Sequence, residues 1–229
     1  MNTAMPTKVQ VFCTNGIKSV FTALDDELST KAGASVAATF ASTKALVDRI
    51  AGGERPDLAI LSDEAIEVLI GQGKLAGRRV DIAKASIGVA VRKGAPHPDI
   101  GSTEAFIRML RAAPSISRSR RGISGLHFAD VIERLGLTLE LAPKIKVYDG
   151  HAGQACANGE TDVAIQQISE LMPIDGLDIL GPLPNDLQKT MTVSAAIGAD
   201  SKARSAAEAV IAYVKSQTHV LRAKGLDPA

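Results

Sequence analysis

The fold is first indicated by KVQVFCTNGIKSVFTALDDELSTKAG, residues 8–33. Its opening part, 8–14, is an apolar run typical of a buried strand. Apolar side chains then recur every three or four positions, which predicts an amphipathic helix over 17–31 that ends near Gly33. A strand that leads directly into a helix is the repeating unit of parallel α/β proteins.

The same alternation of strand and helix patterns continues to the end of the chain. Further strands are expected at 35–41, 57–62, 85–94, 144–148, 162–167 and 177–180. Further helices are expected from Thr43 to the Gly52-Gly53 pair, at 103–112, 124–135 and 152–158, and at 201–217. This order predicts an α/β protein whose sheets are mainly parallel and flanked by helices.

Two strands, 85–92 and 190–197, each lie between one α/β series and the other. We interpret them as crossover strands that form a hinge. Lobe 1 would then comprise 1–84 plus 198–229, and lobe 2 would comprise 93–189, inserted into lobe 1. A chain of this design is expected to hold its ligand in a cleft between the lobes, beyond the carboxyl ends of the strands.

The composition excludes several classes of function. A formal net charge of +1 and an aromatic content of 3% without tryptophan argue against nucleic-acid binding. No run reaches the roughly 18 apolar residues of a membrane span. Cys13 and Cys156 fit no metal-binding spacing and the four histidines are scattered, so we expect no metal site built by the protein.

The amino-terminal segment MNTAMPTKVQVF lacks the basic and apolar regions of a secretory signal. As the sequence stands, we therefore expect a cytoplasmic protein. If a leader has been removed, the expected location is the periplasm.

Polar residues gather where strands are expected to lead into helices. Backbone N–H groups at several such junctions can together bind an anion, although Asn, Ser and Thr there also serve as ordinary helix caps. The junction residues proposed to bind the ligand are Asn15, Gly16, Ser42, Thr43, Ser124, Gly125, Gln166 and Gln167.

The segment SISRSRRGISG, 115–125, places three arginines just before the helix at 124–135, in what reads as a loop. Arginine pairs with carboxylates in a bidentate and directional way, so the group favours a di- or tricarboxylate ligand. Lys44 would add a positive contact from the other lobe. A solvated basic loop is the alternative. The ligand-binding residues proposed here are Arg118, Ser119, Arg120, Arg121 and Lys44.

Three residues are candidate bases for proton transfer, and the sequence does not choose among them. His127 lies in the first turn of the helix at 124–135, either at the core edge or facing the cleft. His151 begins a helix, where the dipole favours the neutral imidazole that a general base requires. Lys44 is the third candidate.

Four stretches resemble the periplasmic molybdate-binding protein family of type II substrate-binding proteins: KVQVFCTNGIKSVF, the segment from TFASTKAL to IGQGKL, ISGLHFADVIERLGL and LRAKGLDPA. The resemblance implies the two-lobe type II periplasmic-binding-protein fold, which is usually monomeric. At ligand positions of that family this chain has Gly16, Gln167 and Arg118-Ser119, which indicates a ligand other than molybdate.

The stretches AIQQISELMPIDGLDILGPLP (164–184) and GVAVRKGAPHPDI (88–100) resemble a branch of the same superfamily represented by bacterial aconitate isomerase. The resemblance implies cofactor-independent isomerisation of an unsaturated polycarboxylate by allylic proton transfer. The alternative is a solute-binding protein of a transporter that captures a carboxylate or oxyanion unchanged. In both cases the expected partner is a small anion.

Overall fold

The structure is a computed structural model that describes residues 8–150 and 152–229. The chain forms two compact units: unit 1 runs up to Lys84 and resumes at Met191, and unit 2 is the continuous segment Ala85–Thr190. Each unit is built on one sheet flanked by helices, so the α/β class expected from the sequence is confirmed.

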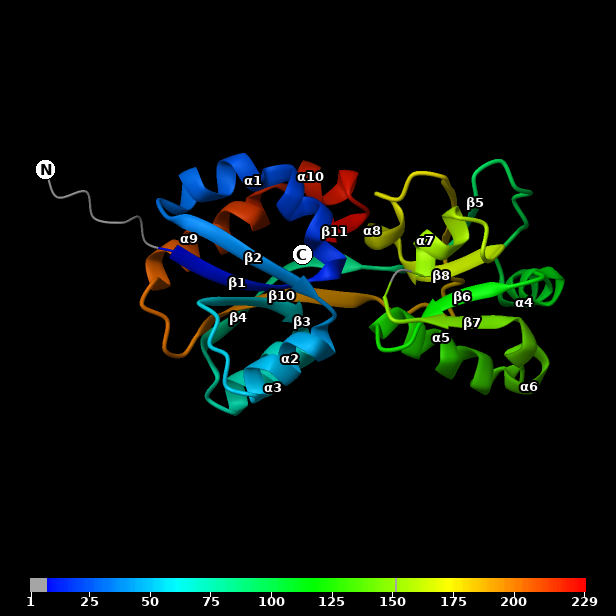
Figure 1. The fold of residues 1–229 in the computed structure, drawn as a ribbon, viewed down its shortest axis with the longest axis horizontal. Helices are drawn as coiled ribbons and strands as arrows, with labels where there is room; N and C mark the ends of the chain where they lie inside the picture. Colours follow the sequence, from blue (N-terminus) through cyan, green and yellow to red (C-terminus); the bar gives the residue numbers. More distant parts are fainter. Residues whose placement is uncertain (1–7, 151) are drawn as a thin grey trace, which may run out of the picture. The chain divides into compact units, whose positions relative to one another are not determined.

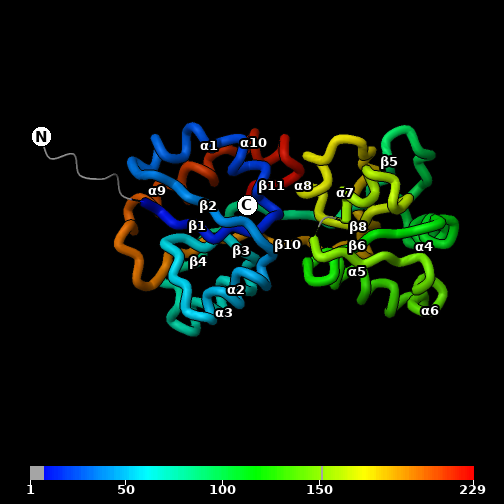
Figure 2. Tube along the Cα trace, in the orientation of Figure 1, coloured from blue at the N-terminus to red at the C-terminus, as the bar shows by residue number. Residues whose placement is uncertain are grey.

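Unit 1 contains a six-stranded sheet in the order β11-β4-β10-β3-β1-β2. Its strands are β1 (Lys8–Thr14), β2 (Ser35–Ala41), β3 (Leu58–Ser62), β4 (Leu75–Ala85), β10 (Met191–Gly198) and β11 (Leu226–Pro228). β1 pairs in parallel with both β2 and β3, whereas β10 runs antiparallel to β3. Figure 2 shows that the last strand, β11, returns to this unit, so unit 1 contains both the early and the final segments of the described chain.

Helices cover both faces of the unit 1 sheet (Figure 1). They are α1 (Lys18–Ala32), α9 (Arg204–Ser216) and α10 (Thr218–Ala223) on one face, and α2 (Thr43–Ala51) and α3 (Asp63–Gly71) on the other, with a 3-10 turn, η1, at Asn15–Ile17. The apolar stripe predicted for α2 is buried through Leu46 and Ile50, which pack with Ile66 and Leu69 of α3. Burying such stripes is the main source of helix stability in a globular protein.

Unit 2 contains a five-stranded sheet in the order β7-β6-β8-β5-β9. Its strands are β5 (Ile87–Arg92), β6 (Ile116–Ser119), β7 (Ile145–Tyr148), β8 (Val163–Gln167) and β9 (Leu177–Pro182). β6 is parallel to β7 and β8, and β5 is antiparallel to β8 and β9. The sheet is therefore mixed, and its parallel half is β7-β6-β8.

The helices of unit 2 enclose two separate clusters of buried side chains. The helices are α4 (Thr103–Ala112), α5 (Ile123–Arg134), α6 (Thr138–Leu141), α7 (Ala152–Ala157) and α8 (Ile168–Leu171), and a 3-10 turn, η2, spans Ala142–Lys144. Phe106 of α4 and Phe128 of α5 belong to the large cluster, whereas Cys156 of α7 and Leu171 of α8 form a small one. Figure 1 shows α7 and α8 on the face of the sheet opposite to α5 and α6.

Several elements differ from the sequence-based prediction. The stretch 116–119 is strand β6, not part of a loop, because it pairs in parallel with β7 on one side and β8 on the other. The buried Ser117 hydroxyl donates to the carbonyls of Ala152 and Val163. β4 was not predicted, since its charged residues interrupt the apolar pattern. Short elements α8, α10 and β11 were also missed.

The predicted crossover strands are each part of one sheet. The stretch 85–92 contains β5, which lies between β8 and β9 in unit 2. The stretch 190–197 is almost all β10, which lies between β4 and β3 in unit 1. The chain therefore passes from unit 1 to unit 2 near residue 85 and returns near residue 190.

Candidate functional site

The parallel half of the unit 2 sheet brings three strand-to-helix junctions to one edge. In the register, Ser119 lies opposite Tyr148 and Arg118 lies opposite Ile165, so β7, β6 and β8 end side by side. The helices α7, α5 and α8 follow these strands in the chain. We call residues 118–125, 152–153 and 166–170 the polar edge of unit 2.

Helix α5 begins at this edge without a side-chain cap. Its N-cap residue is Gly122, whose carbonyl accepts the first hydrogen bond of the helix, from the Leu126 N–H at 3.0 Å. The N–H groups of the three residues before Leu126 have no acceptor inside the helix. Two of these residues, Ser124 and Gly125, are buried. An uncapped helix start with buried N–H groups favours an anion.

Two glycines allow α5 to start directly against Ser119. A Cβ atom at Gly125 would lie 2.0 Å from the Ser119 carbonyl oxygen, and one at Gly122 would lie 2.4 Å from the Ser119 Oγ. Ser119 is only 4% exposed, and its hydroxyl has no hydrogen-bond partner among the described residues. A buried hydroxyl normally has a partner, so this group is available to a ligand.

The Arg118 side chain extends from β6 to the start of α5 and is partly buried. Its Nη1 donates to the carbonyls of Ser119, at 3.2 Å, and Gly125, at 3.3 Å. Its buried Nε has no partner in the part of the chain that the structure describes. Burial lowers the pKa of Arg118, and the positive charge of Arg120 lowers it further. A buried charge without a counter-ion is costly, so Arg118 favours the binding of an anion.

The other two arginines differ from Arg118. Arg120 is exposed, and its Nε lies 3.1 Å from the Asp149 Oδ1. Arg121 is exposed and forms no ion pair or hydrogen bond with the residues described. Of the three arginines predicted as one group, Arg118 and Arg121 therefore have no carboxylate partner within the described part of the chain.

Gln166 and Gln167, at the end of β8, are both buried. The Oε1 of Gln166 accepts a hydrogen bond from the Gly153 N–H at 2.9 Å, and its Nε2 donates to the Glu170 carboxylate. Gln167 is the N-cap residue of α8 and provides no side-chain cap bond. Gln166 thus connects the start of α7 to α8.

Glu170 is the titratable group at this edge that the sequence analysis missed. It lies in α8, and burial raises the pKa of its carboxyl, although the hydrogen bond from Gln166 offsets part of the rise. The missed helix α8 is four residues long, too short for a periodic signal. The available sequence signal was one acidic residue in an apolar stretch directly after a buried strand.

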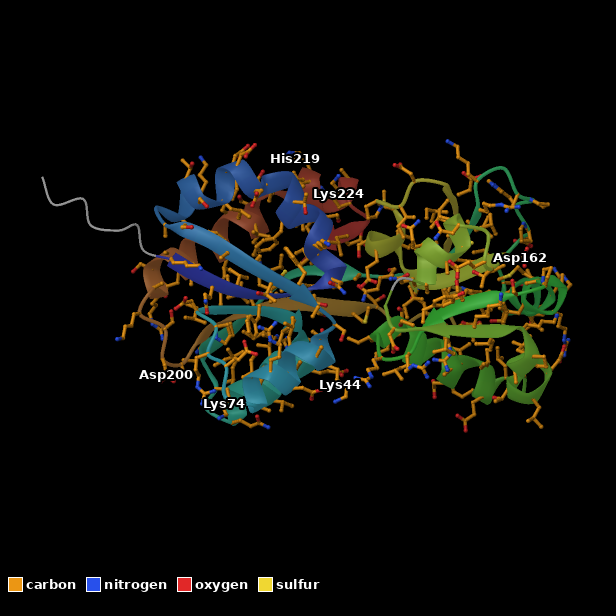
Figure 3. All side chains as sticks on the ribbon, viewed as in Figure 1. Lys44, Lys74, Asp162, Asp200, His219 and Lys224 are labelled. Carbon is orange, nitrogen blue, oxygen red and sulfur yellow. The ribbon has the colours of Figure 1, made fainter. Side chains whose placement is uncertain are left out.

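The three predicted bases have different surroundings. The Nε2 of His127 lies 2.7 Å from the Leu187 carbonyl oxygen and donates to it, because a carbonyl only accepts. Lys44 projects from the first turn of α2 (Figure 3), is 60% exposed and pairs with Asp48 at 3.1 Å. His151 lies outside the described residues. His127 and Lys44 are thus already engaged by other groups.

Two of the predicted residues of unit 1, Ser42 and Thr43, form hydrogen bonds within that unit. Ser42 caps α2 by accepting from the Ala45 N–H at 3.3 Å, and the Thr43 hydroxyl lies 3.3 Å from that of Thr14. Asn15 and Gly16 form the turn η1, before α1. At the carboxyl ends of the unit 1 strands, a structural role thus accounts for Ser42 and Thr43.

A metal site or a membrane span is not observed within 8–150 and 152–229. No three His, Cys, Asp or Glu side chains of that part are grouped so that they could hold a metal ion. None of its helices combines the length and the hydrophobicity needed to cross a bilayer.

Two α/β units, one inserted into the other, are the two-lobe arrangement of the periplasmic-binding-protein fold. The chain belongs to the bacterial extracellular solute-binding protein family, whose model matches residues 9–226. It is 32% identical over 190 residues to aconitate isomerase from a Pseudomonas species, with 81% of this chain and 72% of the relative covered.

Solved structures of low sequence identity share the fold. The periplasmic molybdate-binding protein of Azotobacter vinelandii matches with a TM-score of 0.78 and 19% identity, over 95% of this chain and 98% of that protein. The sulfate-binding protein SubI of Mycobacterium tuberculosis matches with a TM-score of 0.70 and 16% identity, over 97% and 87%. The resemblance to type II substrate-binding proteins is thereby confirmed.

Proposed function

We propose that the polar edge of unit 2 binds a small anionic polycarboxylate and that the protein isomerises this ligand by allylic proton transfer. The observation that carries the proposal is Arg118, a partly buried guanidinium without a carboxylate partner among the described residues, beside the uncapped start of α5. A bound carboxylate would supply the missing counter-ion.

The number of donors favours a ligand with more than one carboxylate. Arg118 offers its Nε, the start of α5 offers backbone N–H groups, and Arg121 offers a further guanidinium on the exposed side. Arg118, Arg121 and the start of α5 follow one another in the chain, and each can bind a separate carboxylate of the ligand. The similarity to aconitate isomerase supports a tricarboxylate of this kind.

The proposed reaction moves a double bond by one position. Removal of a proton from the methylene carbon beside the double bond leaves an electron pair shared over three carbons, and a proton returned to the far carbon completes the shift. Carboxylates held by guanidinium and backbone N–H groups would stabilise this carbanion. No redox step is involved, so the reaction balances without a cofactor.

The second candidate function is binding without turnover. The folds of the molybdate- and sulfate-binding proteins favour it, since both of these relatives are named as binding proteins. Of the two locations considered from the sequence, the periplasm agrees with the description of the family as extracellular.

The test uses trans-aconitate with the full chain. Proton NMR in deuterated water should show cis-aconitate with deuterium incorporated, and calorimetric titration should show binding. Binding without conversion would reject the isomerase and support the second candidate. Absence of binding across a panel of di- and tricarboxylates would reject both carboxylate proposals.

The arginine pair tests the location of the site. The double variant Arg118→Ala/Arg121→Ala should weaken binding of trans-aconitate by at least about 100-fold, because removal of charge-assisted hydrogen bonds costs about 1.5–3 kcal/mol each. The matched control is Arg111→Ala, which removes an exposed guanidinium of the same unit that pairs with Glu140 at 2.9 Å. Equal affinities in the double variant and the control would place the site elsewhere.

A further inference from the structure

We propose that the Glu170 carboxylate is the base that takes the methylene proton of the substrate; this inference rests on the isomerase activity proposed above. Glu170 lies at the polar edge of unit 2, directly after the strand whose neighbour carries Arg118. Of the three bases predicted from the sequence, His127 and Lys44 are engaged by other groups, and His151 lies outside the described residues.

The carboxylate is held in a defined orientation. The Nε2 of Gln166 donates to its Oε2, while the Oε1 of Gln166 accepts from the Gly153 N–H at 2.9 Å. The amide of Gln166 is therefore fixed at both ends, and it fixes Glu170 in turn. A base must be positioned within hydrogen-bond reach of the proton that it removes, so such support from a buried neighbour is a requirement of the chemistry.

The surroundings of Glu170 suit a base better than a structural ion pair. In the part of the chain that the structure describes, no cationic side chain pairs with Glu170, and its hydrogen-bond donor is a neutral amide. Burial disfavours the charged form and raises the pKa of the carboxyl, which makes the carboxylate more basic. Glu170 is partly exposed as a residue, whereas its carboxyl group is buried.

Among the described residues, the two competing bases His127 and Lys44 do not share these surroundings. The Nε2 of His127 donates to a backbone carbonyl, and the ammonium of Lys44 pairs with Asp48. A carboxylate accepts one proton, becomes neutral and returns the proton to the other end of the allylic unit. The cycle therefore leaves Glu170 ionised as at the start, with no further reactant.

The variant Glu170→Gln tests the proposal because an amide keeps the size of the side chain and an oxygen for Gln166, but accepts no proton. Its dissociation constant for trans-aconitate should stay within about threefold of the wild-type value. Its kcat should fall at least about 100-fold, the usual contribution of a general base, together with deuterium incorporation into the substrate. Glu170→Asp should recover part of the activity, which a merely structural role would not predict.

The matched control is Glu160→Gln, which alters an exposed carboxylate of unit 2 that accepts a hydrogen bond from the Tyr148 hydroxyl. It should leave both kcat and affinity unchanged. A melting curve of Glu170→Gln that matches the wild type would establish that the variant is folded; if it is not folded, Glu170→Asp carries the test.

The outcomes separate this inference from the proposed function. If the wild-type protein isomerises and Glu170→Gln isomerises at a similar rate, the inference is overturned and the isomerase stands. If the wild type binds trans-aconitate without converting it, the isomerase proposal fails and the inference fails with it. Weaker binding in Glu170→Gln, with kcat at saturation unchanged, would make Glu170 a binding residue and overturn its role as base.

Discussion

At the scale of the residue, Gly125 decides how closely α5 approaches β6. A methyl group there would meet the Ser119 carbonyl oxygen at 2.0 Å, and backbone atoms move only when the whole turn shifts. Gly125→Ala should therefore lower the free energy of unfolding by about 1–3 kcal/mol, the usual range for overpacking. Because the shift would displace the uncapped N–H groups of α5, affinity for the anion should fall as well. Urea unfolding and calorimetric titration measure the two effects.

Gly71→Ala is the control for Gly125→Ala. Gly71 ends α3, and a methyl group added to it would meet no atom within 4 Å. Alanine there should therefore be neutral or stabilising by up to about 1 kcal/mol through helix propensity. If both alanine variants unfolded at the same urea concentration, the close contact between α5 and β6 would be contradicted.

At the scale of the element, the helices α2 and α3 of unit 1 begin in the same way. Ser42 accepts from the Ala45 N–H and Ser62 accepts from the Ala65 N–H, at 3.3 and 3.4 Å. Each replacement, Ser42→Ala or Ser62→Ala, should cost about 1 kcal/mol of stability, because a helix N–H loses its acceptor. Thermal unfolding checks this value. Replacement by Asp, which also caps, should restore stability, and failure to do so would refute the capping role.

At the scale of the whole molecule, the two units differ in continuity. Unit 2 is the unbroken segment Ala85–Thr190, and its large cluster of buried apolar side chains, which includes Phe106 and Phe128, comes from that segment alone. A fragment of about 100 residues with its own core reaches the size of an independent domain. We expect the fragment 85–190 to give dispersed NMR signals and a cooperative melting transition.

Unit 1 provides the comparison for this experiment. Its strand β10 comes from the carboxyl-terminal segment and lies between β4 and β3 of the amino-terminal segment. A fragment that ends at Lys84 would lack β10, the strand between β4 and β3, so it should stay unfolded. A cooperative transition in this fragment, or none in 85–190, would contradict the division into units.

Local sequence determined most of the helices and the two-part α/β design. The periodic apolar residues of α1, α2, α4 and α9 predicted these helices to within a few residues. The prediction works because the buried face of an amphipathic helix carries an apolar residue every three or four positions. The aconitate isomerase branch was also identified from sequence, on the stretch that contains Gln166 and Glu170.

Tertiary structure alone decided what the polar residues do. Arg118 became a partly buried strand residue because β7 and β8 pair with its short strand on either side. The folded chain pairs Lys44 with Asp48, and it places the carbonyl of Leu187, 60 positions away, within hydrogen-bond distance of His127. Glu170 acquired its raised pKa through burial. Desolvation and hydrogen-bond partners depend on which distant segments pack together, and a linear pattern of residues does not contain that information.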